Sequence, residues 1–139
     1  MTRFRDTGAT LYGLAGEVLV VCPSCGSCAR VTGARGVCPS CAWTATPSRK
    51  GFAYGAPEDP FLDLPLWLVT DVGGETLWAF NAEHLDLLES YVSATLRERV
   101  PDRTHYTLVE KLPAWVKSAK NRDAVLAGVA RLRARLAAA

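Results

Sequence analysis

The sequence lacks any apolar stretch as long as the roughly 18–20 residues that a membrane-spanning helix needs. It also lacks the pattern of a secretory leader. The apolar stretch at residues 11–21 is broken by Gly13, Gly16 and Glu17, and no small-residue cleavage site follows it. These absences indicate a protein without membrane contact. We therefore expect a cytoplasmic location, where cysteines stay reduced.

The common motifs of catalysis are missing as well. The sequence contains no Gly-rich phosphate loop, no Gly-x-Ser-x-Gly elbow and no His-Glu-x-x-His. Its two histidines are His84 and His105. His84 falls in the first turn of an expected helix, where a packed or capping role is favoured because the helix dipole disfavours a charged imidazole. We expect a protein that is not an enzyme, and an enzyme with an unrecognised site is the least favoured alternative.

Basic residues are missing from the middle of the chain. Residues 51–96 contain eight acidic residues and no Arg or Lys, whereas residues 1–50 carry a balance of +4 and residues 97–139 a balance of +6. Either these segments neutralise one another within the fold, or the basic ends form a surface for an anionic partner. From charge alone the first interpretation is favoured.

What the sequence does have is a cysteine pattern. Four of its five cysteines form two pairs, Cys22-Pro-Ser-Cys25 and Cys38-Pro-Ser-Cys41, with twelve residues between them. Two such pairs have the number and spacing of ligands in a structural zinc site. A redox pair would stand at a helix N-terminus, and here strands are expected on both sides. We therefore predict one structural zinc ion, although a rubredoxin-like iron site would use the same ligands.

Four thiolates would fill the coordination sphere of that metal. No position remains for a substrate or an activated water, so the site would supply folding energy rather than catalysis. The fifth cysteine, Cys28, either competes with Cys25 for the metal, acts as a redox-sensitive thiol, or is a small half-buried strand residue. The last of these is favoured.

The two cysteine pairs resemble the zinc ribbons of transcription factor IIB, of RNA polymerase subunits and of many small bacterial proteins. The resemblance covers about residues 17–46. It implies a rubredoxin-like knuckle fold and a binding role, with either nucleic acid or protein as the partner. The second pair departs from the pattern, because Ala42 stands where the first pair has Gly26 and where a positive φ is often needed.

Residues 17–21, 29–32 and 42–46 are rich in β-branched residues and flank the cysteine pairs. They predict a small antiparallel sheet with the metal at one end, preceded by a loosely structured lead-in at residues 1–16. Residues 55–65 carry three prolines and three large apolar residues, which predicts an ordered, packed loop.

Residues 66–80 contain two aromatic and β-branched runs around Gly73-Gly74, which predicts a β-hairpin. Asn81 then offers an N-cap, and the apolar stripe that follows predicts a helix over residues 82–100. Weaker strand candidates lie at residues 52–54 and 107–112.

The C-terminal segment, residues 113–137, predicts either one helix or two. Pro113 suits a first turn, and Asn121 offers a second start. An apolar seam at Val125, Val129, Leu132 and Leu136 is a candidate contact for a partner helix or a homodimer.

The candidate residues for binding an anionic partner are basic and lie in two groups. They are Arg30 and Arg35 in the ribbon, and Lys117, Lys120, Arg122, Arg131, Arg133 and Arg135 near the C-terminus. Trp43 and Trp115 lie close to them in sequence, and aromatic rings beside basic groups can stack on bases, although both tryptophans are by default core residues.

Taken together, the sequence predicts an α+β protein. Residues 1–50 form a zinc ribbon with its lead-in, and residues 51–139 form a module of the hairpin and two or three helices. The predicted function is a non-enzymatic binding module, slightly favoured to contact nucleic acid in transcription or replication. The alternative is a protein-interaction adaptor that uses the ribbon face or the C-terminal seam.

Overall fold

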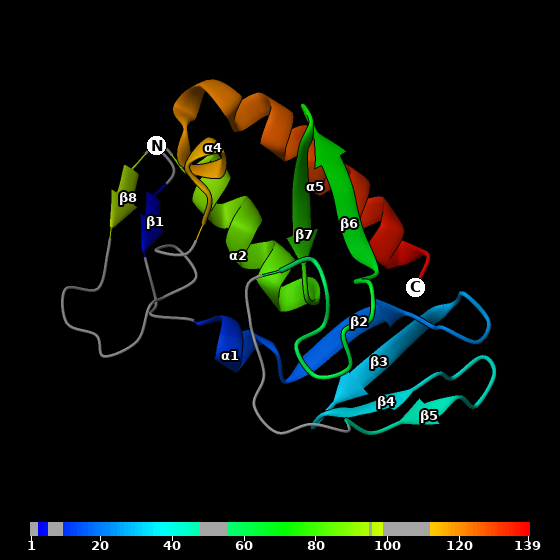
Figure 1. Ribbon diagram of the computed structural model, residues 1–139. Helices are drawn as coiled ribbons and strands as arrows, with labels where there is room; N and C mark the ends of the chain where they lie inside the picture. Colours follow the sequence, from blue (N-terminus) through cyan, green and yellow to red (C-terminus); the bar gives the residue numbers. More distant parts are fainter. Residues whose placement is uncertain (1–2, 6–9, 48–55, 95, 99–111) are drawn as a thin grey trace.

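The computed structural model describes residues 3–5, 10–47, 56–94, 96–98 and 112–139 (Figure 1). In chain order its elements are β1 (Arg3–Arg5), α1 (Leu11–Leu14), β2 (Glu17–Val21), β3 (Cys28–Thr32), β4 (Arg35–Val37), β5 (Thr44–Ala45), β6 (Leu68–Val72), β7 (Glu75–Ala79), α2 (Ala82–Ser93), β8 (Leu96–Glu98), α4 (Ala114–Lys117), the 3-10 turn η1 (Ala119–Asn121) and α5 (Arg122–Ala137). The fold is mixed α and β, and its paired strands are antiparallel except for the parallel pair β1–β8.

The N-terminal sheet has the order β2-β3-β4-β5. Strands β2 and β3 form where the sequence predicts them, β5 covers part of the predicted range 42–46, and β4 lies outside the predicted ranges. Alternate valines face one side of this sheet: Val18 pairs with Val31, and both are fully buried. Gly33 and Ala34 make the turn between β3 and β4, both with positive φ (58° and 65°). That conformation matches the twist of a two-residue hairpin.

The predicted hairpin is confirmed as β6 and β7, joined by Gly73 and Gly74 with φ of 57° and 88°. One of its faces packs against α2 and α5. The N-terminal sheet, β2-β3-β4-β5, is called the ribbon sheet below, and it lies at one end of the hairpin (Figure 1). Residues from this hairpin face, α2 and α5 form one of the two apolar cores.

Helix α2 begins as predicted, because Asn81 Oδ1 accepts the N–H of His84 at 2.9 Å. The prediction that it continues to residue 100 is wrong. It ends at Ser93, and Leu96–Glu98 instead form β8, which pairs in parallel with β1. The partner strand lies far away in sequence, so the local apolar period carries no sign of it.

A tertiary contact also marks the end of α2. Arg122 in α5 donates from Nη2 to the carbonyl oxygen of Ala94 at 3.2 Å, and Ala94 itself is extended (ψ 138°). The prediction of a loosely structured lead-in over residues 1–16 is likewise wrong for Arg3–Arg5 and Leu11–Leu14, which form β1 and α1.

The C-terminal segment contains α4, η1 and α5 rather than one continuous helix. Ser118 is extended (φ −71°, ψ 128°) and separates α4 from η1. Asn121 precedes α5 as predicted, but its side chain turns back and donates to the carbonyl oxygen of Trp115 at 3.0 Å instead of capping α5.

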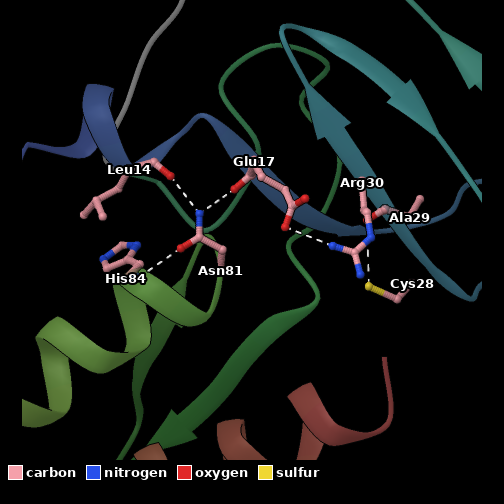
Figure 2. Close-up of polar contacts among 7 residues, drawn as sticks. All are labelled: Leu14, Glu17, Cys28, Ala29, Arg30, Asn81 and His84. Carbon is pink, nitrogen blue, oxygen red and sulfur yellow. Dashed lines mark hydrogen bonds and ion pairs between the residues drawn. The ribbon is translucent and has the colours of Figure 1, made fainter.

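The ribbon is hydrogen-bonded to the base of the hairpin. The N–H of Leu19 donates to the carbonyl oxygen of Phe80 at 2.8 Å, and the carbonyl oxygen of Leu19 accepts the N–H of Trp67 at 2.9 Å. Asn81 adds two hydrogen bonds, in which its Nδ2 donates to the carbonyl oxygens of Leu14 and Glu17 (Figure 2). Its Oδ1 caps α2 at the same time. One side chain thereby sets the angle between α2 and the ribbon.

The loop before the hairpin is ordered, as predicted. Asp59 is 1% exposed, and its carboxylate accepts the N–H groups of Phe61, Leu62 and Leu64 at 2.7–2.9 Å. These bonds hold the loop's apolar side chains against the second core, which contains Val18, Val20 and Val31 of the N-terminal sheet together with Leu14 and Phe80. The predicted boundary at residues 50 and 51 lies outside the described residues. So do the strand candidates at 52–54 and 107–112, except Leu112, which is not in a strand.

Candidate metal centre and binding face

The two cysteine pairs adopt the same backbone turn. In the first, the N–H of Gly26 donates to the carbonyl oxygen of Cys22 at 2.9 Å, and the N–H of Cys22 donates to that of Ser27 at 2.8 Å. In the second, Ala42 and Trp43 take the places of Gly26 and Ser27 around Cys38, at the same 2.9 and 2.8 Å. The repeated spacing in sequence therefore becomes a repeated structure, a pair of knuckles.

These knuckles bring the sulfurs of Cys22, Cys25, Cys38 and Cys41 within 4.8 Å of one another. The Sγ atoms of Cys22 and Cys41 are 3.7 Å apart, and those of Cys25 and Cys38 are 3.6 Å apart. A disulfide would bring a pair to about 2.05 Å. Four ligands at about 2.3 Å from a central ion form a tetrahedron with edges of about 3.8 Å. The predicted set of four cysteines is thus positioned to bind a single metal ion.

Backbone N–H groups and the crowding of sulfurs set the acidity of the thiols. The N–H of Ser27 lowers the pKa of Cys25 to about 6. The N–H of Trp43 acts in the same direction on Cys41, but desolvation and the three neighbouring sulfurs outweigh it and raise the pKa of Cys41 to about 11. Four thiolates this close repel one another, so their full deprotonation calls for a cation among them.

Ala42 confirms the departure noted in the sequence. It adopts φ of 64°, close to the 78° of Gly26 at the equivalent position. A residue with a Cβ pays roughly 1–2 kcal/mol in this region. The second knuckle keeps the conformation nonetheless, with the same backbone hydrogen bonds as the first.

Cys28 lies outside this cluster. It is 9% exposed on β3, in the core shared with Leu19 and Trp67, and its Sγ is 3.8 Å from the carbonyl oxygen of Ala29 (Figure 2). Burial raises the pKa of its thiol. A buried, protonated thiol is a poor ligand and a poor nucleophile, so the placement agrees with the favoured interpretation of a small apolar residue.

The four C-terminal arginines are bonded within the chain. Arg133 pairs with Asp86 and Glu89 on α2, each at 2.6 Å. Arg131 donates to Thr70 Oγ1 at 3.0 Å and to the carbonyl oxygen of Asp71 at 2.6 Å. This helix therefore pairs with the acidic middle of the chain, as the first interpretation of the charge pattern expects.

Arg135 and Arg122 also contact the fold. The guanidinium of Arg135 lies 3.5 Å from the ring centroid of Trp67, whose Nε1 donates back to the carbonyl oxygen of Arg135 at 2.9 Å. Arg122 contacts the end of α2. Of the two lysines, Lys117 is half-buried and Lys120 is exposed.

The apolar seam of the C-terminal helix and Trp115 also pack against the first core. Val125, Val129 and Leu132 of the apolar seam are at most 1% exposed in the core, and Leu136 packs partly against it. Trp115 is half-buried against the same core.

The ribbon arginines lie elsewhere, on the open face of β3 and β4. Arg30 stands opposite Val37, and Thr32 stands opposite Arg35. Together with Pro39 these exposed residues line a groove of about 330 Å³. The two arginines are predicted from the sequence, whereas Thr32, Val37 and Pro39 are not. The period-two alternation of β3 places Thr32 with Arg30, but only the strand register brings Val37 across.

Trp43 lies behind the opposite face of the same sheet. Its ring packs on Gly36, where a Cβ would come within 2.6 Å of it, and it belongs to the second core. His84 is also a core residue, 1% exposed, and its Nδ1 accepts the N–H of Phe80 at 3.0 Å. Both residues thus take the structural roles that the sequence analysis favours for them.

No family model, curated protein or solved structure matches this chain. In the part of the chain that the structure describes, every helix is too short or too polar to cross a membrane.

Proposed function

We propose that the chain is a non-enzymatic zinc-ribbon module. One structural zinc ion, held by Cys22, Cys25, Cys38 and Cys41, locks the ribbon, and the open face of the ribbon binds a partner. The observation that supports this most directly is the cluster of four sulfurs within 4.8 Å of one another, in which the Cys22–Cys41 and Cys25–Cys38 distances of 3.7 and 3.6 Å match the edge of a tetrahedral site. Zinc is preferred over iron because zinc is the usual ion of structural sites with four cysteines.

The metal would act on folding rather than on chemistry. Four thiolates complete a tetrahedral shell and leave no site at which a substrate could bind. The described ribbon strands are short, at two to five residues each. Such short strands need a further constraint, and a structural zinc ion supplies on the order of 10 kcal/mol in small domains.

For the partner, the proposal favours protein over nucleic acid. Binding to a nucleic-acid backbone uses several free cations and exposed aromatic platforms. Here Arg131 and Arg133 bind within the chain, and Trp43 and Trp115 are half-buried against the cores. Arg30 and Arg35 remain exposed on the ribbon face beside apolar surface, a mixture typical of protein interfaces.

Metal analysis of freshly purified protein tests the metal site, with Cys28→Ala as the matched control. We expect one zinc ion per chain in the wild type and in Cys28→Ala, and loss of zinc in Cys38→Ser, because three ligands hold zinc far less tightly than four. Protein without bound metal would overturn the proposal. Stoichiometric iron would replace zinc by a rubredoxin-like site, and equal metal loss in both variants would show that the assigned ligands are wrong.

A further inference from the structure

The open face of the ribbon carries a groove made by the strand register. Arg30 and Thr32 alternate along β3 with Ala29 and Val31 of the second core, so both point away from that core. Their cross-strand neighbours on β4 are Val37 and Arg35. Arg30 thus lies opposite the apolar Val37, and Arg35 lies opposite the polar Thr32. Most of the surface that lines the groove is apolar.

The groove presents cations that are available to a ligand. Arg35 is exposed, and its side chain has no hydrogen-bond or ion-pair partner among the described residues. Arg30 pairs with Glu17 through Nη1 at 2.9 Å, but both side chains are about half exposed. An exposed pair of this kind contributes about 1 kcal/mol or less, and the guanidinium keeps further N–H donors for a second acceptor.

The groove also presents apolar surface. Val37 is 42% exposed, and it is one of two large apolar side chains with high exposure among the described residues. It lies opposite Arg30 and next to Pro39 in the lining. An apolar side chain seated here would cover Val37, which water contacts in the free protein.

We propose that this groove binds an acidic segment of a partner protein, in which one apolar residue is flanked by carboxylates. This rests on the proposed ribbon module and names its ligand. The apolar side chain contacts Val37 and Pro39, one carboxylate pairs with Arg35, and the other takes the free donors of Arg30. Charge complementarity selects acidic residues, and the planar guanidinium favours bidentate carboxylate bonds.

A nucleic acid fits this groove less well. Two arginines, one of them shared with Glu17, would neutralise few phosphates, and binding to a nucleic acid grows with the number of phosphates neutralised. Among the described residues, those that line the groove include no aromatic ring on which a base could stack.

Selection from a phage-displayed library of random dodecapeptides on the zinc-loaded full chain tests the proposal. The Arg35→Glu variant serves for counter-selection. We expect enriched peptides with Asp or Glu on both sides of an apolar residue. The proposal would be overturned if no peptide bound the wild type better than the Arg35→Glu variant, or if the enriched peptides lacked acidic residues.

A synthetic peptide from that selection then locates the site by amide chemical-shift mapping and by affinity. Shifts should concentrate at Arg30, Thr32, Arg35 and Val37. Arg35→Glu should weaken binding about tenfold or more, and Val37→Ser about fivefold. Lys120→Glu, the matched charge reversal at an exposed site outside the groove, should leave the affinity unchanged.

Two outcomes distinguish a failure of the groove assignment from a failure of the proposed zinc-ribbon module. If every variant keeps one zinc ion and a dispersed spectrum but the shifts fall outside the groove, the groove assignment fails while the zinc ribbon stands. If the wild type holds no metal, both fail. Mixed-sequence single-stranded DNA that shifts the same amides, with affinity falling steeply with salt, would replace the acidic peptide by a nucleic acid.

Discussion

At the scale of single residues, Asn81 and His84 show how one helix start is built from two side chains. Asn81 Oδ1 accepts the N–H of His84, and His84 Nδ1 accepts the N–H of Phe80. The arrangement resembles a capping box with histidine in the place of Glu or Gln, except that His84 accepts from Phe80, the residue before the N-cap, and not from the N-cap itself. The imidazole must be neutral at Nδ1 to accept, and it stacks edge-on against Trp78 and Phe80.

His84 should make the stability of the protein depend on pH. Burial lowers its pKa from 6.5 to about 4, so the folded state favours the neutral imidazole. Its contribution is complete above the unfolded pKa of 6.5 and is lost as the pH falls through about 4. Over that window the free energy of unfolding should fall by about 3 kcal/mol from this group alone.

Urea unfolding at a series of pH values checks this, with His84→Gln as the control. The amide oxygen of Gln can accept a hydrogen bond and does not titrate. The cysteines titrate in both proteins, so their effect cancels in the difference between wild type and variant. That difference should shrink as the pH falls from 6.5 towards 4, and a difference that stays constant with pH would contradict the assignment.

At the scale of elements, α5 and the hairpin approach each other closely at Gly128. A Cβ built there would lie 2.7 Å from Val72 Cγ2 and 3.1 Å from Leu77 Cδ2. A glycine in mid-helix costs about 1 kcal/mol relative to alanine. The close contact with β6 and β7 explains why the position carries no side chain.

Gly128→Ala should therefore destabilise the protein although alanine is the better helix former. Overpacking of a stiff β-branched neighbour costs about 1–3 kcal/mol, which exceeds the gain in propensity. Combining Gly128→Ala with Val72→Ala removes the clashing methyl groups, so the two substitutions should be less harmful together than their sum. Denaturant unfolding of both single variants and the double variant measures that coupling, and simple additivity would show that the contact does not limit packing.

At the scale of the whole molecule, the ribbon and the hairpin share hydrogen bonds at Leu19. The central charge contrast is also resolved within the chain, where Arg133 of the basic C-terminal helix meets Asp86 and Glu89 of the acidic middle. Because the bonds at Leu19 connect the ribbon to the hairpin, a metal bound in the ribbon also stabilises the base of the hairpin.

Removal of the metal should loosen the hairpin base as well as the ribbon. The N–H groups of Leu19 and Trp67 bond across the junction, and both bonds need β2 in place. In hydrogen-exchange measurements, chelation should remove protection from residues 17–46 and from Trp67. The amides of α5 that face α2 should keep most of theirs, because that contact lies in the other core. Unchanged protection throughout would show that the fold does not depend on a metal.

Three local features follow from the sequence alone: the two knuckles, the Gly-Gly hairpin and the Asn81 cap. Each of these depends on residues within a few positions of one another, so spacing and turn chemistry carry the information. The four candidate metal ligands belong to this class, because two identical turns present them.

Features that join residues distant in sequence depend on the tertiary fold. Helix α2 stops at Ser93 because Leu96–Glu98 pair with β1 and Arg122 takes the carbonyl oxygen of Ala94. The C-terminal arginines, which look like a binding surface in sequence, contact acidic groups and carbonyl oxygens far away along the chain. Conversely, Val37 joins Arg30 and Arg35 through strand register alone. The sequence shows which side chains are charged or apolar. Whether such a side chain contacts the rest of the chain or stays exposed to a partner depends on what the fold places opposite it.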